Sequence, residues 1–542
     1  MLRAEFRDVK FEMPQERIEA IADSLSAYFS YQFGEKDSIQ FDLGPLVTLG
    51  EDEAYYGRNS TSRRDEFIYK AVMEACLSSS DSVNFSVYDY DSNGTVDNVL
   101  LLLSGESEAL GAGEDHIWPQ QAYLSDWSTT LSLNGKKIET FCVSSEADGL
   151  GTLCHEFSHS LGLQDLYDTD GSASGGTSPG VWGTLSLMDK GNKLPTPPNF
   201  CAIELEYLGI GECDTLKAGS WKLEPLSRGR RFVKAFTDTP EEFFLLECRH
   251  TQGWDESIGC SGLAIYHIDR SDRDAGYSYY YRQNLSASER WLYGQVNCNP
   301  DYECAALIPA RTDASGVSQV TFPQMGIREF TSCTTPPFVY HSGTPSPLAI
   351  TDIVADGDGS VSFTVFEPIA ITEISSFQDA AIISWKTAGQ LGDPCPVELS
   401  YAPVVTKPDT LTVSTKEHNV RLENLQSGTR YNVEVKVLQA DRKSYSASGS
   451  FRTKTVKSGS GAYIYLAGTL RSGDGSFVSG AKIPLEVFNC PDAEQIIWTF
   501  DGKAVTVGPD GYFTVTDSGT LKATILLSDG SVETIIKEIT VK

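Results

Sequence analysis

The sequence lacks any long hydrophobic run. Its longest stretch drawn only from hydrophobic residue types is six residues, from Ala462 to Ala467, whereas a membrane-spanning helix needs about 20. The N-terminal residues also lack the apolar segment and small-residue cleavage site of a secretory signal peptide. We therefore expect no transmembrane segment and no signal peptide in this chain.

Basic residues are scarce, because 43 Lys and Arg stand against 74 Asp and Glu and leave a net charge of −31. A chain this acidic repels phosphate backbones, so nucleic acid is excluded as a partner. Cysteine is scarce too, at 12 of 542 residues without a CxxC spacing, which excludes a disulfide scaffold. The close pairs Cys248/Cys260 and Cys298/Cys304 fit either disulfide bridges or free buried thiols.

The length of 542 residues predicts two to four domains, since one hydrophobic core stops growing at about 250–300 residues. Apolar spacings of three and four predict helices over 14–29, 66–77 and 149–163, and an apolar run predicts a central strand over 96–104. Residues 1–212 are therefore expected to form an α/β or α+β domain. Short alternating runs between glycine and proline turns predict a β-rich subdomain over 213–367.

Two further β modules are predicted after residue 367. Residues 368–456 resemble a fibronectin type III domain, with Trp385 on an early strand, Leu425 capping the core and Tyr431 as the tyrosine corner. The Ser/Gly-rich segment 457–461 is the plainest linker in the chain. Residues 462–542 resemble an immunoglobulin-like sandwich, although Cys490 has no cysteine on the expected later strand. We expect both modules to serve as spacers or as weak contacts to a surface, matrix or glycan.

One segment carries catalytic chemistry, Cys154-His-Glu-Phe-Ser-His-Ser-Leu-Gly-Leu-Gln-Asp165. On a helix, His155 and His159 lie one turn apart on one face, so both imidazoles can bind one tetrahedral zinc ion. Glu156 beside them is placed to take a proton from a zinc-activated water and pass it to a leaving amine. Gly162 can adopt a positive φ and end the helix, which lets the chain return Asp165 as a third ligand.

The segment HEFSHSLGLQDLYDT resembles the active-site helix of the immune inhibitor A family of secreted, metzincin-like bacterial metallopeptidases, peptidase family M6, which has HExxHxxGLxDxYD there. Other pieces match the family in order over about residues 1–365. They are EFRDVKF at the start, YYG-x-N at 55–59, the aspartate loop at 89–97, Ile117-Trp118, the segment 182–198, Glu247-Cys-Arg249, Trp254-Asp255 and Gly262 to His267. The resemblance implies a zinc metalloendopeptidase with a metzincin-like catalytic domain.

The resemblance also implies roles for residues around the metal. Met188 would form the apolar floor that metzincins place beneath the zinc, or else simply fill the core. Asp165 stands where many metzincins have a third histidine, and Glu204 on the next predicted helix is the alternative third ligand. Asp168 would either orient a ligating histidine or cap a turn.

Asp189-Lys190 replaces the tyrosine that some members carry two residues after the methionine. Without that tyrosine, the resemblance does not identify the residue that acts as the second stabiliser of the transition state. The candidates are Tyr167 and His116.

The loop from Asp89 to Asp97 predicts a calcium site. Oxygen ligands alternate along it around Gly94, as in the first half of an EF-hand loop; they are Asp89, Asp91, Asn93, the Thr95 carbonyl and Asp97. Leu100 stands where an EF-hand has its bidentate glutamate. A solvated turn is the alternative to calcium.

Together these observations predict a secreted zinc-dependent endopeptidase that hydrolyses extracellular proteins. We expect it to act as a monomer. Its expected location is the outside, the cell surface or the periplasm of a bacterium. Family members are made with a propeptide and none precedes Arg3, so the chain is expected to be trimmed. The alternative function is that of a surface adhesin or glycan- or matrix-binding protein with a degenerate protease scaffold.

Overall fold

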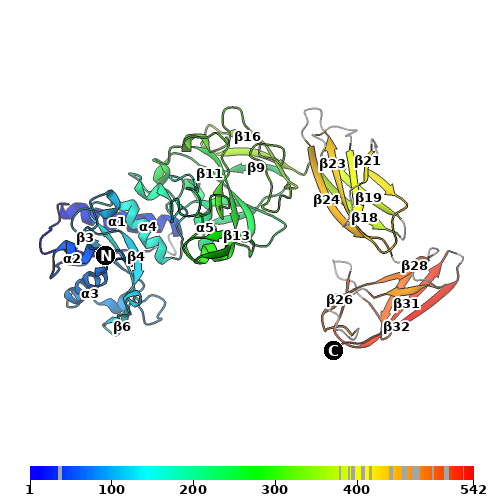
Figure 1. The fold of residues 1–542 in the computed structure, drawn as a ribbon, viewed down its shortest axis with the longest axis horizontal. Coiled ribbons are helices and arrows are strands. Elements are labelled where there is room, and N and C mark those ends of the chain that lie inside the picture. The colour runs from blue at the N-terminus through cyan, green and yellow to red at the C-terminus, as the bar shows by residue number, and fades with distance from the viewer. Residues whose placement is uncertain are drawn as a thin grey trace. The chain divides into compact units, whose positions relative to one another are not determined.

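The structure is a computed structural model of the 542-residue chain. It describes residues 1–34, 39–377, 380–388, 391, 397–403, 409–413, 418–438, 444–454, 461–466, 476–490, 493–505, 512–528 and 530–542. The chain divides into two compact units, residues 1–366 and residues 367–542 (Figure 1). In the described part of the chain no helix has both the length and the hydropathy that crossing a membrane requires.

A five-stranded sheet organises the N-terminal part of the first unit. Its strands follow the order β2 (Leu46–Thr48), β1 (Leu2–Glu5), β3 (Val99–Leu103), β7 (Thr140–Ser145) and β4 (Gln120–Tyr123). All pairs are parallel except the edge pair of β4 with β7. The predicted central strand is thus confirmed as β3, which is buried along its whole length because helices cover both of its faces.

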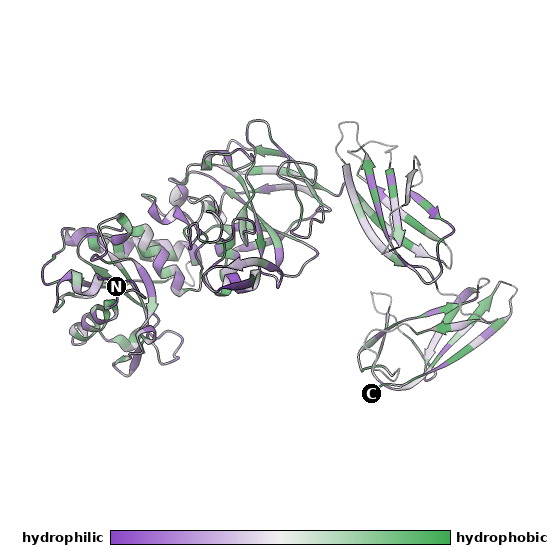
Figure 2. Cartoon of the chain, viewed as in Figure 1, coloured by the Kyte–Doolittle hydropathy of each residue, from purple (hydrophilic) through white to green (hydrophobic). Residues whose placement is uncertain are grey.

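Three helices cover this sheet. Leu100 and Leu102 of β3 join the core that contains residues of α1 (Gln15–Phe33) and α4 (Leu150–Ser160). Leu101 and Leu103 point to the opposite core, which contains the buried face of α3 (Ile68–Ser79). Apolar and polar residues alternate along these helices in Figure 2, as amphipathic packing requires. The three predicted helices are therefore confirmed, with ends shifted by a few residues.

The rest of the first unit is β-rich, as predicted. A second five-stranded sheet runs in the order β15-β12-β11-β10-β8, and a three-stranded sheet in the order β16-β17-β9. The strand bounds are β8 Glu212–Thr215, β9 Gly219–Leu223, β10 Arg231–Phe236, β11 Glu242–Arg249, β12 Gly262–Asp269, β15 Ala305–Leu307, β16 Ala349–Ala355 and β17 Val361–Phe366.

Strand β11 belongs to two cores at once. Phe243 and Leu245 pack with the helices α1 and α4, whereas Phe244 and Leu246 pack between the two β-sheets. One hydrophobic core therefore crosses the boundary predicted at residue 212. The shorter elements of this unit are α2 Glu53–Gly57, β5 Leu131–Leu133, β6 Lys136–Ile138, α5 Ala202–Leu208, α6 Leu226–Gly229, β13 Asp274–Ser278, β14 Gln283–Ser286 and α7 Ala287–Leu292.

The second unit begins with a sandwich of a three-stranded and a four-stranded antiparallel sheet, in the orders β18-β19-β22 and β21-β20-β23-β24. The Tyr431 hydroxyl accepts a hydrogen bond from the Gln426 N–H at 2.8 Å, which confirms the tyrosine corner. Trp385 and Leu425 are buried as expected. The bounds are β18 Ile369–Ser376, β19 Ala381–Thr387, β20 Val397–Pro403, β21 Asp409–Val413, β22 Asn419–Leu422, β23 Arg430–Leu438 and β24 Ser444–Arg452.

The last segment is also β-rich. Its largest sheet has the order β29-β28-β31-β32, and two strand pairs, β25 with β27 and β26 with β30, complete it. The bounds are β25 Tyr463–Tyr465, β26 Ala481–Pro484, β27 Glu486–Phe488, β28 Ala493–Phe500, β29 Lys503–Ala504, β30 Tyr512–Val515, β31 Gly519–Leu527 and β32 Val532–Ile539. The immunoglobulin-like assignment stays a prediction. Residues 457–460 of the predicted linker lie outside the described residues.

The two cysteine pairs singled out in the sequence are not bridged. Cys248, Cys260, Cys298 and Cys304 are all buried free thiols, and burial raises the pKa of Cys248, Cys260 and Cys304. The disulfide alternative is therefore wrong for both pairs.

Candidate metal centre

Helix α4 places the two motif histidines on one face. Their Nε2 atoms lie 3.2 Å apart, since residues four apart are one helical turn apart. The helix ends at Ser160, and Gly162 follows with φ +97°. This left-handed conformation favours glycine. It turns the chain back and brings Asp165 to the histidines.

Three ligand atoms converge at this point. The Asp165 Oδ1 atom lies 3.2 Å from His155 Nε2 and 3.4 Å from His159 Nε2. Zinc bonds of 2.0–2.1 Å at tetrahedral angles place ligand atoms about 3.3 Å apart. Among the described residues, Asp165 Oδ1 is buried without a hydrogen-bond donor. The spacing and the unsatisfied oxygen both fit a zinc ion.

The other ring nitrogen of each histidine is held by the backbone. His155 Nδ1 lies 2.9 Å from the Leu187 carbonyl oxygen, and His159 Nδ1 lies 2.9 Å from the Leu163 carbonyl oxygen. A carbonyl only accepts, so both Nδ1 atoms carry hydrogen and both Nε2 lone pairs point at each other. Two facing lone pairs beside a carboxylate repel unless a cation lies between them.

The electrostatics of the metal-free site follow from this geometry. Burial opposes ionisation of Asp165, but the two adjacent imidazoles outweigh burial and lower the pKa of its carboxyl well below the usual range. Burial likewise opposes charge on His155, yet contact with Asp165 and the nearby Glu156 raises the pKa of the imidazole to about 9. Protons therefore replace the cation in a metal-free chain.

Glu156 lies in the cavity beside the ligands. This cavity has a volume of about 290 Å³, and His155, Glu156 and Tyr167 line it. Burial raises the pKa of Glu156, although the two histidines oppose the shift. A buried carboxylate with a raised pKa is a stronger proton acceptor than an exposed one, as a general base must be.

The segment around Met188 contacts one of the histidines through its backbone. Met188 is fully buried, and its neighbour Leu187 holds His155. Glu204 Oε1 accepts hydrogen bonds from the Ser186 hydroxyl at 2.5 Å and the Met188 N–H at 3.0 Å. Glu204 Oε2 accepts from the Cys201 N–H at 2.6 Å. The structure therefore brings Asp165, and not Glu204, to the histidines.

Glu204 is tied to the second sheet by a buried ion cluster. Arg249 is fully buried and pairs with Glu247 at 3.2 Å and Asp255 at 2.6 Å. Glu247 accepts the N–H of Ala202, the first residue of α5, at 2.5 Å. The motif residues Glu247, Arg249 and Asp255 thus hold the helix that carries Glu204.

The structure gives Asp168 and His116 contacts outside the metal centre. Asp168 does not orient a ligating histidine; its oxygens accept the N–H groups of Asp170 and Ser178, both at 3.1 Å, so it caps a turn. His116 is not among the residues that line the cavity, and its Nδ1 lies 3.2 Å from Glu53. Tyr167 is the candidate stabiliser that does line the cavity, and burial together with Asp165 raises the pKa of its hydroxyl.

The predicted calcium loop has mixed features. Gly94 has φ +91°, and carboxylate oxygens of Asp89, Asp91 and Asp97 lie within 4.8 Å of one another. However, the Lys136 ammonium lies 2.5 Å from Asp89 and already offsets part of that negative charge. Asn93 accepts the Thr95 N–H at 2.8 Å, a turn contact. Calcium binding stays a prediction.

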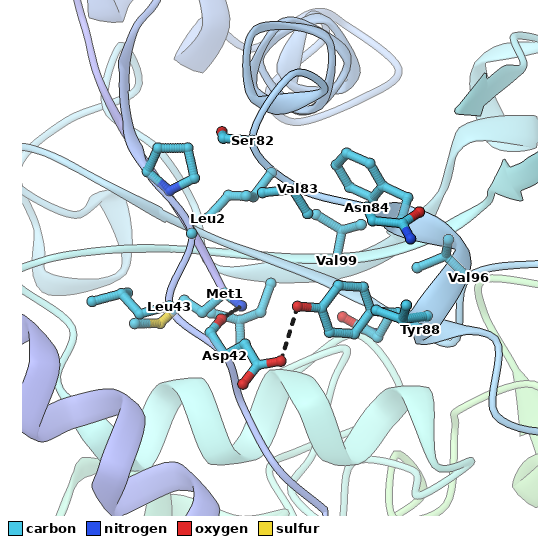
Figure 3. Close-up of a pocket in the computed structure, with 16 residues that line it drawn as sticks. Met1, Leu2, Asp42, Leu43, Ser82, Val83, Asn84, Tyr88, Val96 and Val99 are labelled. Atoms are coloured by element: carbon cyan, nitrogen blue, oxygen red, sulfur yellow. Dashed lines mark hydrogen bonds between the residues drawn. The ribbon is translucent and has the colours of Figure 1, made fainter. Parts of the chain in front are cut away.

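A second cavity of about 230 Å³ lies at the start of β1 (Figure 3). The Tyr88 hydroxyl donates to Asp42 Oδ2 at 2.9 Å across it, and its other labelled side chains are mostly apolar. Neither the two histidines nor Asp165 line it. It is therefore distinct from the metal centre.

Sequence reasoning gave no binding role to three polar residues of the metal-centre cavity. Lys190, Asn192 and Lys193 line it together with His155 and Glu156. They directly follow the Met188 turn, and this adjacency is the one signal that could have pointed to them.

Comparison with known proteins agrees with this geometry. Residues 5–207 match the M6 peptidase family. The matching family model is described as the catalytic domain of immune inhibitor A peptidase M6, so the resemblance of the motifs is confirmed. Residues 5–207 are thus similar to the catalytic domain of a metallopeptidase family.

Two relatives illustrate how much of the chain is shared. Immune inhibitor A of Bacillus thuringiensis subsp. alesti is 24% identical over 217 residues, which is 34% of this chain and 31% of that protein. The pre-pro-metalloprotease PrtV of Vibrio cholerae serotype O1 is 23% identical over 180 residues, 28% of this chain and 20% of that protein. The chain thus matches less than a third of the length of either relative.

Two solved structures match a short part of the chain. The fn3 domain of human collagen alpha-1(XX) is 26% identical and covers 16% of this chain and 85% of its own, with a TM-score of 0.15. The fn3 domain of human contactin 1 is 21% identical and covers 17% and 82%, also with a TM-score of 0.15. The strand pairing, and not these scores, establishes the sandwich.

Proposed function

We propose that this chain is a secreted zinc-dependent endopeptidase that hydrolyses peptide bonds of extracellular proteins, with a metzincin-like catalytic domain. The observation that carries the proposal is the convergence of His155 Nε2, His159 Nε2 and Asp165 Oδ1 at 3.2–3.4 Å from one another. The match of residues 5–207 to the M6 catalytic domain supports it independently.

The three converging side chains would hold the metal, and the backbone carbonyls of Leu187 and Leu163 fix both rings for this task. A bound zinc ion would supply Lewis acidity toward a scissile carbonyl and toward water. Asp165 contributes a negative charge where a third imidazole would be neutral, and this strengthens the attraction of the site for a divalent cation.

Glu156 performs the proton transfers. Its carboxylate lines the cavity beside His155, so it accepts a proton from the attacking water and then donates it to the leaving amine. Tyr167, which lines the same cavity, would stabilise the charge that develops on the carbonyl oxygen.

Metal analysis and one substitution test this proposal. The purified chain should contain about one zinc per molecule, and Glu156→Ala should keep the zinc while losing cleavage of a protein substrate. Glu156→Asp serves as the matched variant, because it keeps a carboxylate on a side chain that is one methylene shorter. It should retain a small residual rate of substrate cleavage. Cleavage by Glu156→Ala at the wild-type rate would refute the mechanism.

The same measurements address the adhesin alternative. A chain without zinc and without proteolysis, whose residues 367–542 bind mucin or matrix, would favour it. The endopeptidase proposal includes a secreted location and a calcium ion bound in the loop from Asp89 to Asp97. Equilibrium dialysis with calcium tests the calcium site.

A further inference from the structure

The cavity beside Glu156 has a basic side formed by one short segment. The 3-10 turn Lys190–Lys193 follows the Met188 turn, and Lys190, Asn192 and Lys193 all line the cavity. Both lysines are exposed. These two ammonium groups lie at a cavity that the carboxylates of Asp148, Glu156 and Asp189 also line.

The backbone of this segment is held tightly against the zinc-site helix. A Cβ atom on Gly151 of α4 would lie 2.2 Å from the Asn192 carbonyl oxygen, so only glycine allows this contact. The Gly191 N–H also donates to the Ser186 carbonyl at 3.0 Å. The segment is therefore placed firmly, one helical turn before His155.

Neither lysine forms an ion pair with a carboxylate among the residues that the structure describes. Over the part of the chain that the structure describes, no carboxylate oxygen lies within 4.0 Å of either ammonium. The neighbouring carboxylate of Asp189 is buried and accepts the Gly183 N–H at 2.9 Å. Asp148, which also lines the cavity, accepts hydrogen bonds from the Ser144 hydroxyl and the Ser145 N–H.

Asn192 supplies a second observation. Its side-chain oxygen is buried yet has no hydrogen-bond donor among the described residues. A buried acceptor without a donor costs free energy unless a ligand satisfies it. The backbone N–H of a polypeptide bound in the cavity is such a donor.

We infer that Lys190, Asn192 and Lys193 form a substrate subsite that selects an aspartate or glutamate side chain close to the scissile bond. The Asn192 oxygen accepts a backbone N–H of the substrate, and the two ammonium groups pair with the acidic side chain. Charge complementarity of this kind gives specificity rather than raw affinity. The inference rests on the proposed endopeptidase function and names the class of peptide it prefers.

A position-scanning peptide library, read by mass spectrometry, tests the inference on the zinc-loaded full chain. Asp and Glu should be enriched at one position within two residues of the cleaved bond. For a peptide pair that differs only by Glu or Gln there, kcat/KM should favour Glu about fivefold. The preference should shrink as ionic strength rises from about 0.05 to about 0.5 M.

Charge reversal identifies the residues. Lys190→Glu combined with Lys193→Glu should abolish or invert the Glu-over-Gln ratio while zinc content is unchanged. Lys217→Glu is the matched control, because Lys217 is exposed, lies outside the cavity and gives the same charge change per substitution; its ratio should stay at the wild-type value. Asn192→Ala should raise KM similarly for both peptides.

Three results would overturn the inference. Cleavage without any acidic preference overturns this inference alone and leaves the endopeptidase proposal standing. A preference for Glu over Gln that persists in the Lys190→Glu/Lys193→Glu double variant also overturns this inference alone. A zinc-loaded wild-type chain that cleaves no member of the library overturns the endopeptidase proposal and the subsite with it.

Discussion

The His155 imidazole is oriented by the Leu187 carbonyl, which lies 2.9 Å from its Nδ1 atom. Leu187 directly precedes Met188 in the turn that Glu204 holds through Ser186 and the Met188 N–H. The metal centre therefore depends on a carboxylate that touches none of its ligand atoms. Hydrogen-bond partners of metal-bound histidines commonly matter this much for metal affinity.

Glu204→Ala is expected to weaken both the fold and the metal centre. It leaves the Cys201 N–H and the Ser186 hydroxyl without their acceptor, and the Met188 N–H with only the Ser186 hydroxyl oxygen. We expect a cost of about 3–5 kcal/mol for these buried donors. Zinc affinity should fall about 10- to 100-fold. Urea unfolding and competition with a chelator measure the two effects. Glu206→Ala on the same helix would be a poor control, because Glu206 is half-buried and pairs with Lys234 and Arg270. Glu256→Ala is preferable, because Glu256 is exposed and loses only the hydrogen bond from the Thr196 hydroxyl.

Gly162→Ala tests the turn that returns Asp165. The side chain has room, since its Cβ would lie 4.0 Å from Tyr207, but φ +97° is unfavourable for alanine. We expect a loss of about 1–2 kcal/mol and weaker zinc binding. Gly316→Ala, at an open position without a positive φ, should change stability by less than about 0.5 kcal/mol. Equal effects of the two substitutions would contradict the role of Gly162.

Metal removal should make stability depend on pH. In the metal-free chain the pKa of His155 is raised to about 9 by Asp165 and Glu156 against the opposing effect of burial. A raised folded-state pKa contributes stability below the unfolded value of about 6.5, and this is lost as pH rises through about 9. Chelator-treated protein should therefore lose up to about 3 kcal/mol between pH 6.5 and 9. Urea titrations at each pH measure this, and His155→Gln should flatten the slope.

Tyr431→Phe separates the second unit from catalysis. The change removes the hydroxyl that accepts the Gln426 N–H at 2.8 Å. It should lower the unfolding free energy of residues 367–542 by about 1–2 kcal/mol and leave zinc content and peptide cleavage unchanged. Calorimetry of the full chain reports the first effect. A loss of peptide cleavage in this variant would show that the second unit acts in catalysis.

Local patterns predicted most of the elements around the site. The apolar spacing along α1, α3 and α4 and the uninterrupted apolar run of β3 are properties of short segments, and the structure confirms them. The positive φ of Gly162 and of Gly94 follows from the same local chemistry, because glycine has no Cβ atom to clash.

Other features required knowledge of what lies opposite in space. His116 was a candidate stabiliser by residue type, but Glu53 from α2 pairs with it. Asp168 was a candidate partner for a histidine, yet the loop that follows it supplies two N–H donors that it caps. The residue type shows which contacts a side chain can make. Which partners lie within reach depends on the fold.

The sequence by itself determined the helix that carries His155, Glu156 and His159, because a four-residue spacing places side chains on one helical face whatever surrounds them. Only the tertiary structure decided that Asp165 joins them while Glu204 accepts the Met188 N–H instead. It also placed Lys190, Asn192 and Lys193 at the cavity. These outcomes depend on how distant segments pack, and packing is set by the shape and hydrogen-bonding needs of the whole core rather than by any one stretch of chain.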